Sequence, residues 1–155
     1  MSAKYFSRIV LSLCTFAAGM LVAGLVTADD IAQIKVVKGT VTIERGTQRL
    51  AGVTGLRLQQ SDVIRTDAQG SVGITFTDNT ILSAGPNTVI ALDRYAFNST
   101  THEGRLDTSV RTGTLSVVSG KIAKQSPEAM TVKTPAAILG VRGTEFFVRV
   151  GEASP

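Results

Sequence analysis

Apolar and polar residues alternate over short segments of this chain, and the helical spacing of apolar residues is nearly absent. Because alternate residues of a strand face the same side of a sheet, a period of two predicts β-strands. In "SVGITFT", Val72, Ile74 and Phe76 share one face; in "IKVVKGTVTIERG", which forms one strand or two around Gly39, Val41 and Ile43 share another. Further strands are predicted in "DVIRT", "TILSA", "TVIALDRYAF", "SVRTGTLSVVSGKIA", "MTVKT" and "TPAAILGVRGTEFFVRV".

Turn-forming residues separate these segments. "TDNT" places Asp78 and Asn79 where a tight reversal needs residues that tolerate positive φ, and "AGPNT" holds Gly85, Pro86 and Asn87 in another turn. Turns that recur roughly every 8 to 12 residues are typical of all-β folds. The sequence therefore predicts a single all-β domain of short strands and tight turns. A β-sandwich or roll and a β-solenoid-like stack both remain open.

The dipeptide Gly-Thr opens a predicted strand three times, at Gly39, Gly113 and Gly143. A solenoid would space such a dipeptide regularly. The separations are unequal, so we interpret Gly-Thr as a favourable transition from turn to strand rather than as a repeat.

The first 28 residues have the pattern of a secretory signal peptide. Lys4 and Arg8 precede an apolar run over residues 9–26, and "VTA" supplies small residues for cleavage after Ala28. The pattern predicts a periplasmic domain of residues 29–155, with a core at about 34–150. The rival interpretation is an uncleaved membrane anchor, since an apolar run of this length is near the lower limit for crossing a bilayer. Membrane contact is expected only through this segment.

Composition excludes several kinds of function. Cys14 is the only cysteine, so cleavage of the signal removes thiol chemistry, disulfides and cysteine metal sites. The loss of Lys4 and Arg8 lowers the 16 basic residues to 14, against 12 acidic residues. These charges are scattered singly, whereas nucleic-acid binding requires a clustered basic footprint. We therefore expect no nucleic-acid partner.

No catalytic constellation is evident. The single histidine, His102, lies in the predicted polar loop Asn98–Ser109, where a solvated role is expected. Asp62, Asp67 and Asp78 fall at turns, where aspartate side chains accept hydrogen bonds from backbone N–H groups. The sequence predicts neither an enzyme nor a bound cofactor or metal.

The turn pattern and the last strand together resemble the FecR domain family of periplasmic envelope signalling proteins. The matching segments are "VVKGTVTIERG", "SDVIRT", "VGITFTDNT", "GPNT" and "VKTPAAILGVRGTEFFV", over about Ile34–Val150. Ser61 and Asn79 stand where the family usually has glycine, so the turn before Asp62 is expected to differ. The structural motif comprises Asp62, Arg65, Thr66, Asp78, Asn79, Gly85, Pro86, Asn87, Gly140, Arg142, Gly143 and Thr144.

The resemblance implies a non-catalytic domain that acts by protein–protein interaction in envelope sensing or signalling. Its expected partner is an envelope or membrane protein. Only eight residues precede the apolar run, so the chain is expected to lack an anti-sigma segment of its own. Two alternatives remain: a small-ligand module for envelope glycan or a metal chelate, and an envelope scaffold. Strand addition at a sheet edge is a plausible way to recruit a peptide.

Arg142 poses a specific question. Counting back by twos from Val150 puts Arg142 on the same face as Phe146, toward a core. Either Gly143 forms a bulge that resets the alternation, or Arg142 stays inward and pairs with a carboxylate. Since the resemblance makes Asp62 and Arg142 fixed points of one pattern, it favours a pair between them that closes the fold.

Overall fold

The computed structural model describes residues 28–141 and 143–151. Most of these residues lie in twelve β-strands, with one short α-helix and one turn of 3₁₀-helix between β9 and β10. The elements are β1 (Asp30–Lys38), β2 (Val41–Arg45), β3 (Gln48–Ala51), β4 (Arg57–Gln59), β5 (Val63–Thr66), β6 (Ser71–Phe76), β7 (Ile81–Ala84), β8 (Val89–Phe97), β9 (Gly104–Val118), α1 (Lys121–Gln125), η1 (Pro127–Ala129), β10 (Met130–Lys133), β11 (Ile138–Gly140) and β12 (Glu145–Val150). The predicted all-β class is confirmed.

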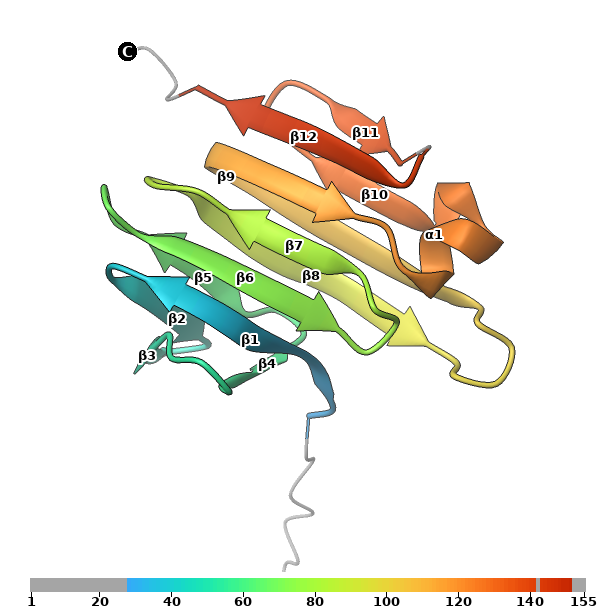
Figure 1. Ribbon diagram of the computed structural model, residues 1–155, viewed down its shortest axis with the longest axis horizontal. Helices are drawn as coiled ribbons and strands as arrows, with labels where there is room; N and C mark the ends of the chain where they lie inside the picture. Colours follow the sequence, from blue (N-terminus) through green and yellow to red (C-terminus); the bar gives the residue numbers. More distant parts are fainter. Residues whose placement is uncertain (1–27, 142, 152–155) are drawn as a thin grey trace, which may run out of the picture.

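The strands form one curled sheet that folds back on itself into two facing layers (Figure 1). The first layer has the order β4-β1-β6-β7-β9-β12, and the second has the order β3-β2-β5-β8-β9-β10-β11. All pairs are antiparallel except β9 with β10. The resulting half-barrel settles the open choice of architecture in favour of a sandwich-like roll.

Strand β9 belongs to both layers. Its first part pairs with β8 and β10, and its last part, residues 113–118, pairs with β7 and β12. Gly113 lies at the changeover with φ +91°, and a Cβ there would lie 2.2 Å from Thr88 Oγ1. Both the backbone conformation and the close approach require glycine, so the curl of the sheet depends on this position.

The two ends of the curled sheet differ. At one end, β3 and β4 are the edge strands, and Arg45 of β2 donates a hydrogen bond from Nη2 to the carbonyl of Arg57 in β4 (2.9 Å). This contact joins the two layers. At the other end, the edge strands are β11 and β12, which pair with different neighbours in different layers. The half-barrel is therefore tied together at the β3–β4 end and open at the C-terminal end.

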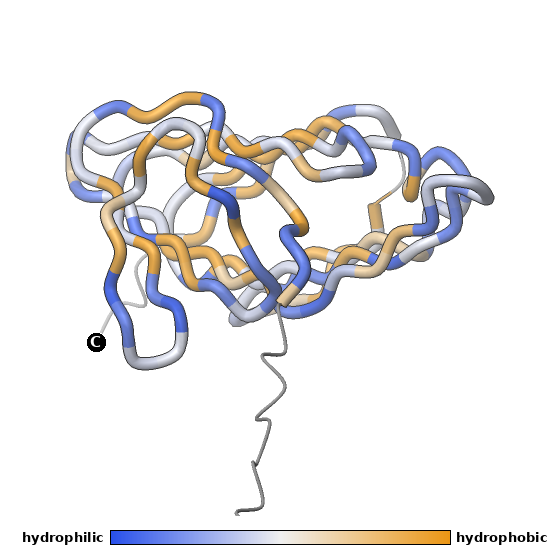
Figure 2. The backbone as a smooth tube through the Cα atoms, turned by 90° about the horizontal axis from the view of Figure 1, so that it is seen from below, coloured by the Kyte–Doolittle hydropathy of each residue, from blue (hydrophilic) through white to orange (hydrophobic). Residues whose placement is uncertain are grey.

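The core fills the space between the layers. Hydrophobic and hydrophilic positions alternate along the strands (Figure 2), and β6 alternates strictly, with Val72, Ile74 and Phe76 all buried. Val41 and Ile43 of β2 are also buried, as predicted. Within the described part of the chain, no helix is long and apolar enough to cross a membrane.

Three predictions about elements were wrong. The segment 104–109, expected in a polar loop, forms the start of β9, and its Asp107 and Thr108 are buried. Residues 121–123, expected at the end of a strand, begin helix α1. The stretch 134–150 is not one strand but two, β11 and β12.

The three Gly-Thr glycines share one backbone property. Gly39, Gly113 and Gly143 have φ values of +61°, +91° and +129°. Residues other than glycine rarely adopt these backbone conformations. Gly39 and Gly143 lie just before strands, as the transition interpretation predicts, but Gly113 lies inside β9. The shared dipeptide thus reports a backbone requirement rather than a structural repeat.

Candidate binding groove

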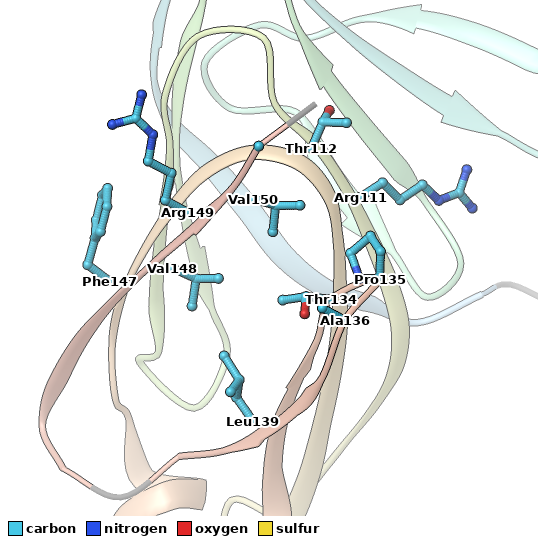
Figure 3. A pocket seen from close by; sticks show the side chains of 11 residues that line it. Arg111, Thr112, Thr134, Pro135, Ala136, Leu139, Phe147, Val148, Arg149 and Val150 are labelled. Atoms are coloured by element: carbon cyan, nitrogen blue, oxygen red, sulfur yellow. The ribbon is translucent and has the colours of Figure 1, made fainter. Parts of the chain in front are cut away.

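The open end of the half-barrel contains a groove of about 530 Å³ between β12 and the β10–β11 hairpin (Figure 3). Three other hollows on the described surface are about half as large, at 260 to 310 Å³. The groove is lined by Arg111, Thr112, Thr134, Pro135, Ala136, Leu139, Phe147, Val148, Arg149, Val150 and Gly151. It is thus built mainly from the C-terminal stretch that carries the strongest family resemblance.

Strand β12 forms one wall. It pairs with β9 from Glu145 opposite Val118 to Val150 opposite Gly113. Alternation along the strand buries Val148 and directs Val150 inward, while Phe147 and Arg149 face out. The wall is therefore apolar on its groove side.

The β10–β11 hairpin forms the facing wall. Its turn is held by Thr134, whose Oγ1 accepts a hydrogen bond from the Ala137 N–H at 3.0 Å, while the Thr134 N–H donates to the Ala137 carbonyl at 2.8 Å. Strand β10 runs parallel to the start of β9, where Thr131 donates a hydrogen bond to the buried Asp107 carboxylate. Leu139 of β11 then points into the groove (Figure 3).

The connection between the two walls is anchored on the end of β9. The Val141 side chain is buried, and its N–H donates to the Met130 carbonyl at 3.1 Å. Ser119 Oγ donates to the Gly143 carbonyl at 2.9 Å, and the Ser119 N–H donates to the Thr144 carbonyl at 2.8 Å. Val141 is buried and Gly143 has a positive φ, while the direction of the Arg142 side chain stays a prediction. Gly140 has open space around its Cα, and Arg142 lies outside the described residues.

Two exposed large apolar side chains line this groove. Phe147 is 65% exposed and Leu139 is 39% exposed, whereas Ile138, the neighbour of Leu139 in β11, is 70% exposed but does not line the groove. Two exposed arginines, Arg111 and Arg149, lie on opposite rims (Figure 3), and no lining residue is acidic. An apolar surface with polar rims is typical of an interaction site.

Asp62 has a partner other than the expected one. Its buried carboxylate accepts two hydrogen bonds from Arg45, Nε to Oδ1 at 2.9 Å and Nη2 to Oδ2 at 2.7 Å. The hydrogen bond to Asp62 raises the pKa of Arg45 above its usual value. The Gln59 N–H also donates to Oδ2 at 2.9 Å. The Arg45–Asp62 ion pair therefore lies at the β3–β4 end, and the expected pair between Asp62 and Arg142 stays a prediction.

The turns that follow β5 and β7 are joined by Thr66 of the motif. Thr66 Oγ1 donates to the Gly85 carbonyl at 2.7 Å and accepts from the Thr88 N–H at 2.9 Å. A Cβ on Gly85 would lie 2.3 Å from Thr114 Oγ1, so this glycine is required by close packing. Arg65 points outward and its Nε lies 2.9 Å from Glu44 Oε1. These residues position strands and do not converge on the groove.

Positive φ values identify the turn residues. Ser61, Asn79 and Asn87 have φ of 72°, 68° and 50°. Asn79 and Asn87 confirm the predicted turns, in which Pro86 lies beside Asn87. Ser61 adopts a positive φ despite its side chain, and the expected difference between this turn and the family's stays a prediction.

Asp78 holds the only α-helix of the described residues against the sheet. Its fully buried carboxylate accepts hydrogen bonds from Thr80 Oγ1 at 2.7 Å and from the Ile122 N–H of α1 at 3.3 Å. Tyr95 contacts it from β8, and burial raises the pKa of the Tyr95 phenol to about 12. The role of Asp78 is therefore structural.

The described residues contain no cluster of histidine, cysteine and carboxylate side chains arranged to bind a metal ion. His102 is exposed in the β8–β9 loop and stacks on Phe97, with ring centroids 6.3 Å apart. The groove itself was not predicted from the sequence. Its only sequence signal is that the apolar residues of "AAIL" and "EFFV" exceed what one buried face can hold.

A comparison with protein-family models identifies one match, to the FecR protein family, over residues 62–154. This range covers more than half of the 155 residues and includes every residue that lines the groove. The chain belongs to the FecR family. No curated protein and no solved structure matches it. The FecR family is a non-enzymatic, envelope-associated signalling family, which agrees with the predicted class of function.

Strands β1 to β4 precede the matched range, although β1 lies next to β6 in the first layer and β2 next to β5 in the second. The FecR match therefore starts at the residue that Arg45 binds and ends beyond the groove. The chain N-terminal to the match supplies Arg45 and the two edge strands at the tied end.

Proposed function

We propose that this FecR-family protein is a periplasmic, non-catalytic domain that acts in envelope sensing or signalling by binding another envelope protein. The observation that supports this most is the open groove, whose lining includes the exposed apolar side chains of Leu139 and Phe147. Burial of such a surface is the usual driving force for protein association. The signal-peptide pattern of residues 1–28 supports export to the periplasm.

A pull-down from envelope extracts tests this proposal. The wild-type protein should recover a stoichiometric envelope or membrane protein, and Leu139→Glu should not, because it places a charge in the apolar groove. Val36→Glu is the matched control, since Val36 is a 55% exposed apolar residue on β1, away from the groove. Recovery of the same partner by Leu139→Glu at the wild-type level would contradict the use of the groove.

A second candidate function is the binding of a small ligand, such as an envelope glycan or a metal chelate. The groove volume of about 530 Å³ falls within the range of small-molecule sites, roughly 300 to 1,000 Å³. Ligand binding to the folded state raises the melting temperature by mass action. A thermal shift with a glycan or chelate that Leu139→Glu abolishes would favour this function over protein binding.

A further inference from the structure

We propose that the groove accepts an extended segment of the partner protein, which adds as a strand to the free edge of β12. The segment carries apolar side chains at alternate positions and a carboxylate at an interleaved position. This inference rests on the proposed function and specifies which kind of partner segment the groove recognises.

The first observation is the edge itself. Within the described residues, β12 pairs only with β9, so every second residue of β12 directs its backbone N–H and C=O away from the sheet. Its six residues would pair with a segment about 20 Å long. An added strand would satisfy these groups and extend the first layer over the groove.

The second observation is the contrast between sheet edges. Proteins usually protect exposed edges with short strands, prolines, lysines or bulges. At the tied end, β3 and β4 have only four and three residues. Strand β12, "EFFVRV", is longer, pairs without a bulge and has neither proline nor lysine. The least protected edge is therefore also the one that borders the groove.

The third observation is the chemistry of the two faces that an added strand would meet. Residues that point into the groove would contact Leu139 and Val150, beside the buried Val148. Residues that point outward would lie beside Phe147 and Arg149, because side chains of neighbouring strands lie side by side on the same face. This arrangement selects apolar residues at alternate positions.

Charge complementarity explains why the partner segment is expected to carry a carboxylate at an outward-facing position. Arg149 and Arg111 lie on the two rims of the groove, and Figure 3 shows both guanidinium groups directed away from its apolar interior. Neither is within salt-bridge distance of an acidic side chain in the described part of the protein. A carboxylate on the outward face of the added strand would pair with Arg149, and the same rims would repel a basic segment.

Selection from a displayed library of random twelve-residue peptides tests the inference on protein produced from the full-length sequence. The enriched peptides should alternate apolar residues with polar ones and include an aspartate or glutamate. A synthetic peptide of the enriched sequence should bind about tenfold more weakly when alternate backbone nitrogens on its pairing edge are methylated, because methylation removes edge hydrogen bonds. Methylation of the opposite edge is the matched control and should have little effect.

Arg149→Glu should weaken binding of the same peptide about fivefold, and the loss should shrink at high salt. Arg49→Glu is the control, because Arg49 is an 80% exposed arginine of β3 at the tied end. A library that enriches no alternating acidic pattern, or a peptide that tolerates methylation on both edges, would overturn the inference. So would a dimer of this chain that occupies the β12 edge and excludes the peptide.

The two experiments distinguish failure of the proposed function from failure of the strand-addition proposal. If the pull-down recovers a groove-dependent envelope partner but the library yields no strand-like peptide, strand addition is wrong and partner binding stands. If the peptide binds as expected but no envelope protein is recovered through the groove, the binding mode stands and the proposed function is wrong.

Discussion

Arg45 and Asp62 form a bidentate ion pair at one end of the second layer, and both side chains also form hydrogen bonds with β4 of the first layer. Nε donates to Oδ1 at 2.9 Å and Nη2 to Oδ2 at 2.7 Å, and the same Nη2 reaches the Arg57 carbonyl of β4. The Asp62 side chain is only 1% exposed, so the carboxylate depends on Arg45 for neutralisation. The pair lies at the opposite end of the strand order from the groove, which leaves the groove edges untied.

Replacing Arg45 by methionine should lower the free energy of unfolding by about 3 kcal/mol, because it leaves the Asp62 carboxylate buried without its cation. A double-mutant cycle with Asp62→Asn, measured by denaturant unfolding, should give a coupling energy of about 2 kcal/mol. The matched control is the Arg65–Glu44 pair, also 2.9 Å apart but on the surface, with side chains 43% and 24% exposed. Its coupling should stay below about 1 kcal/mol.

The same cycle between Asp62 and Arg142 distinguishes the two arginines as partners. A coupling energy larger than that between Asp62 and Arg45 would contradict the role of Arg45 as the main counter-ion of Asp62. The pair with Arg142 that the resemblance suggests stays a prediction, since Arg142 lies outside the described residues.

Three glycine-to-alanine substitutions separate the cost of a positive φ from the cost of a steric clash at the added Cβ atom. Gly113→Ala combines a positive φ with a Cβ that would clash with Thr88, so it should cost more than about 2 kcal/mol. Gly46→Ala meets the positive φ in open space and should cost about 1 kcal/mol. Gly140→Ala meets neither and should be close to neutral. Thermal unfolding of the three variants would contradict this ranking if Gly113→Ala were the mildest.

Tyr95 should make the protein sensitive to alkali over a defined range. Burial raises the pKa of its phenol from 10.0 to about 12, so the neutral form is favoured in the folded state. The stabilisation is complete below pH 10 and is lost as the pH rises toward 12. Tyrosinate absorbance of the folded protein should titrate near pH 12, and that of the urea-unfolded protein near pH 10. A folded-state midpoint at 10 would contradict the burial of this ring.

Export should remove the N-terminal segment. N-terminal sequencing of protein recovered from the periplasmic fraction should begin at Asp29, because the small residues of "VTA" precede the expected cleavage point. Ala28→Arg should block processing and leave a larger, membrane-associated form. A wild-type protein that keeps its first 28 residues in the membrane fraction would favour the anchor interpretation instead.

The sequence predicts most of the strands because a half-buried strand has apolar residues at alternate positions, as in β2 and β6. It does not reveal the start of β9, where polar Asp107 and Thr108 are buried and interrupt the apolar pattern. Helix α1 is too short for a helical period to emerge, and its position depends on distant Asp78. These features depend on tertiary contacts that local patterns do not encode.

The groove could not be predicted from the sequence for a related reason. Alternation in "TPAAILGVRGTEFFVRV" shows which residues share a face, but not that β11 and β12 join different layers. Only the change of layer between Val141 and Glu145 turns one apparent strand into two facing walls. The stretch that carries the strongest family resemblance therefore also lines the surface to which we assign the function, although none of the structural-motif residues that the structure describes lines it.

The central claim, that the open groove contacts an envelope protein, is tested most directly by photo-crosslinking in intact cells. A photoreactive phenylalanine analogue at Leu139 or Phe147, which both line the groove, should form a crosslink to a specific envelope protein. The same analogue at Val53, an exposed apolar residue between β3 and β4 at the tied end, should not. Equal crosslinking from Val53 and the groove positions, or none from the groove, would contradict the claim.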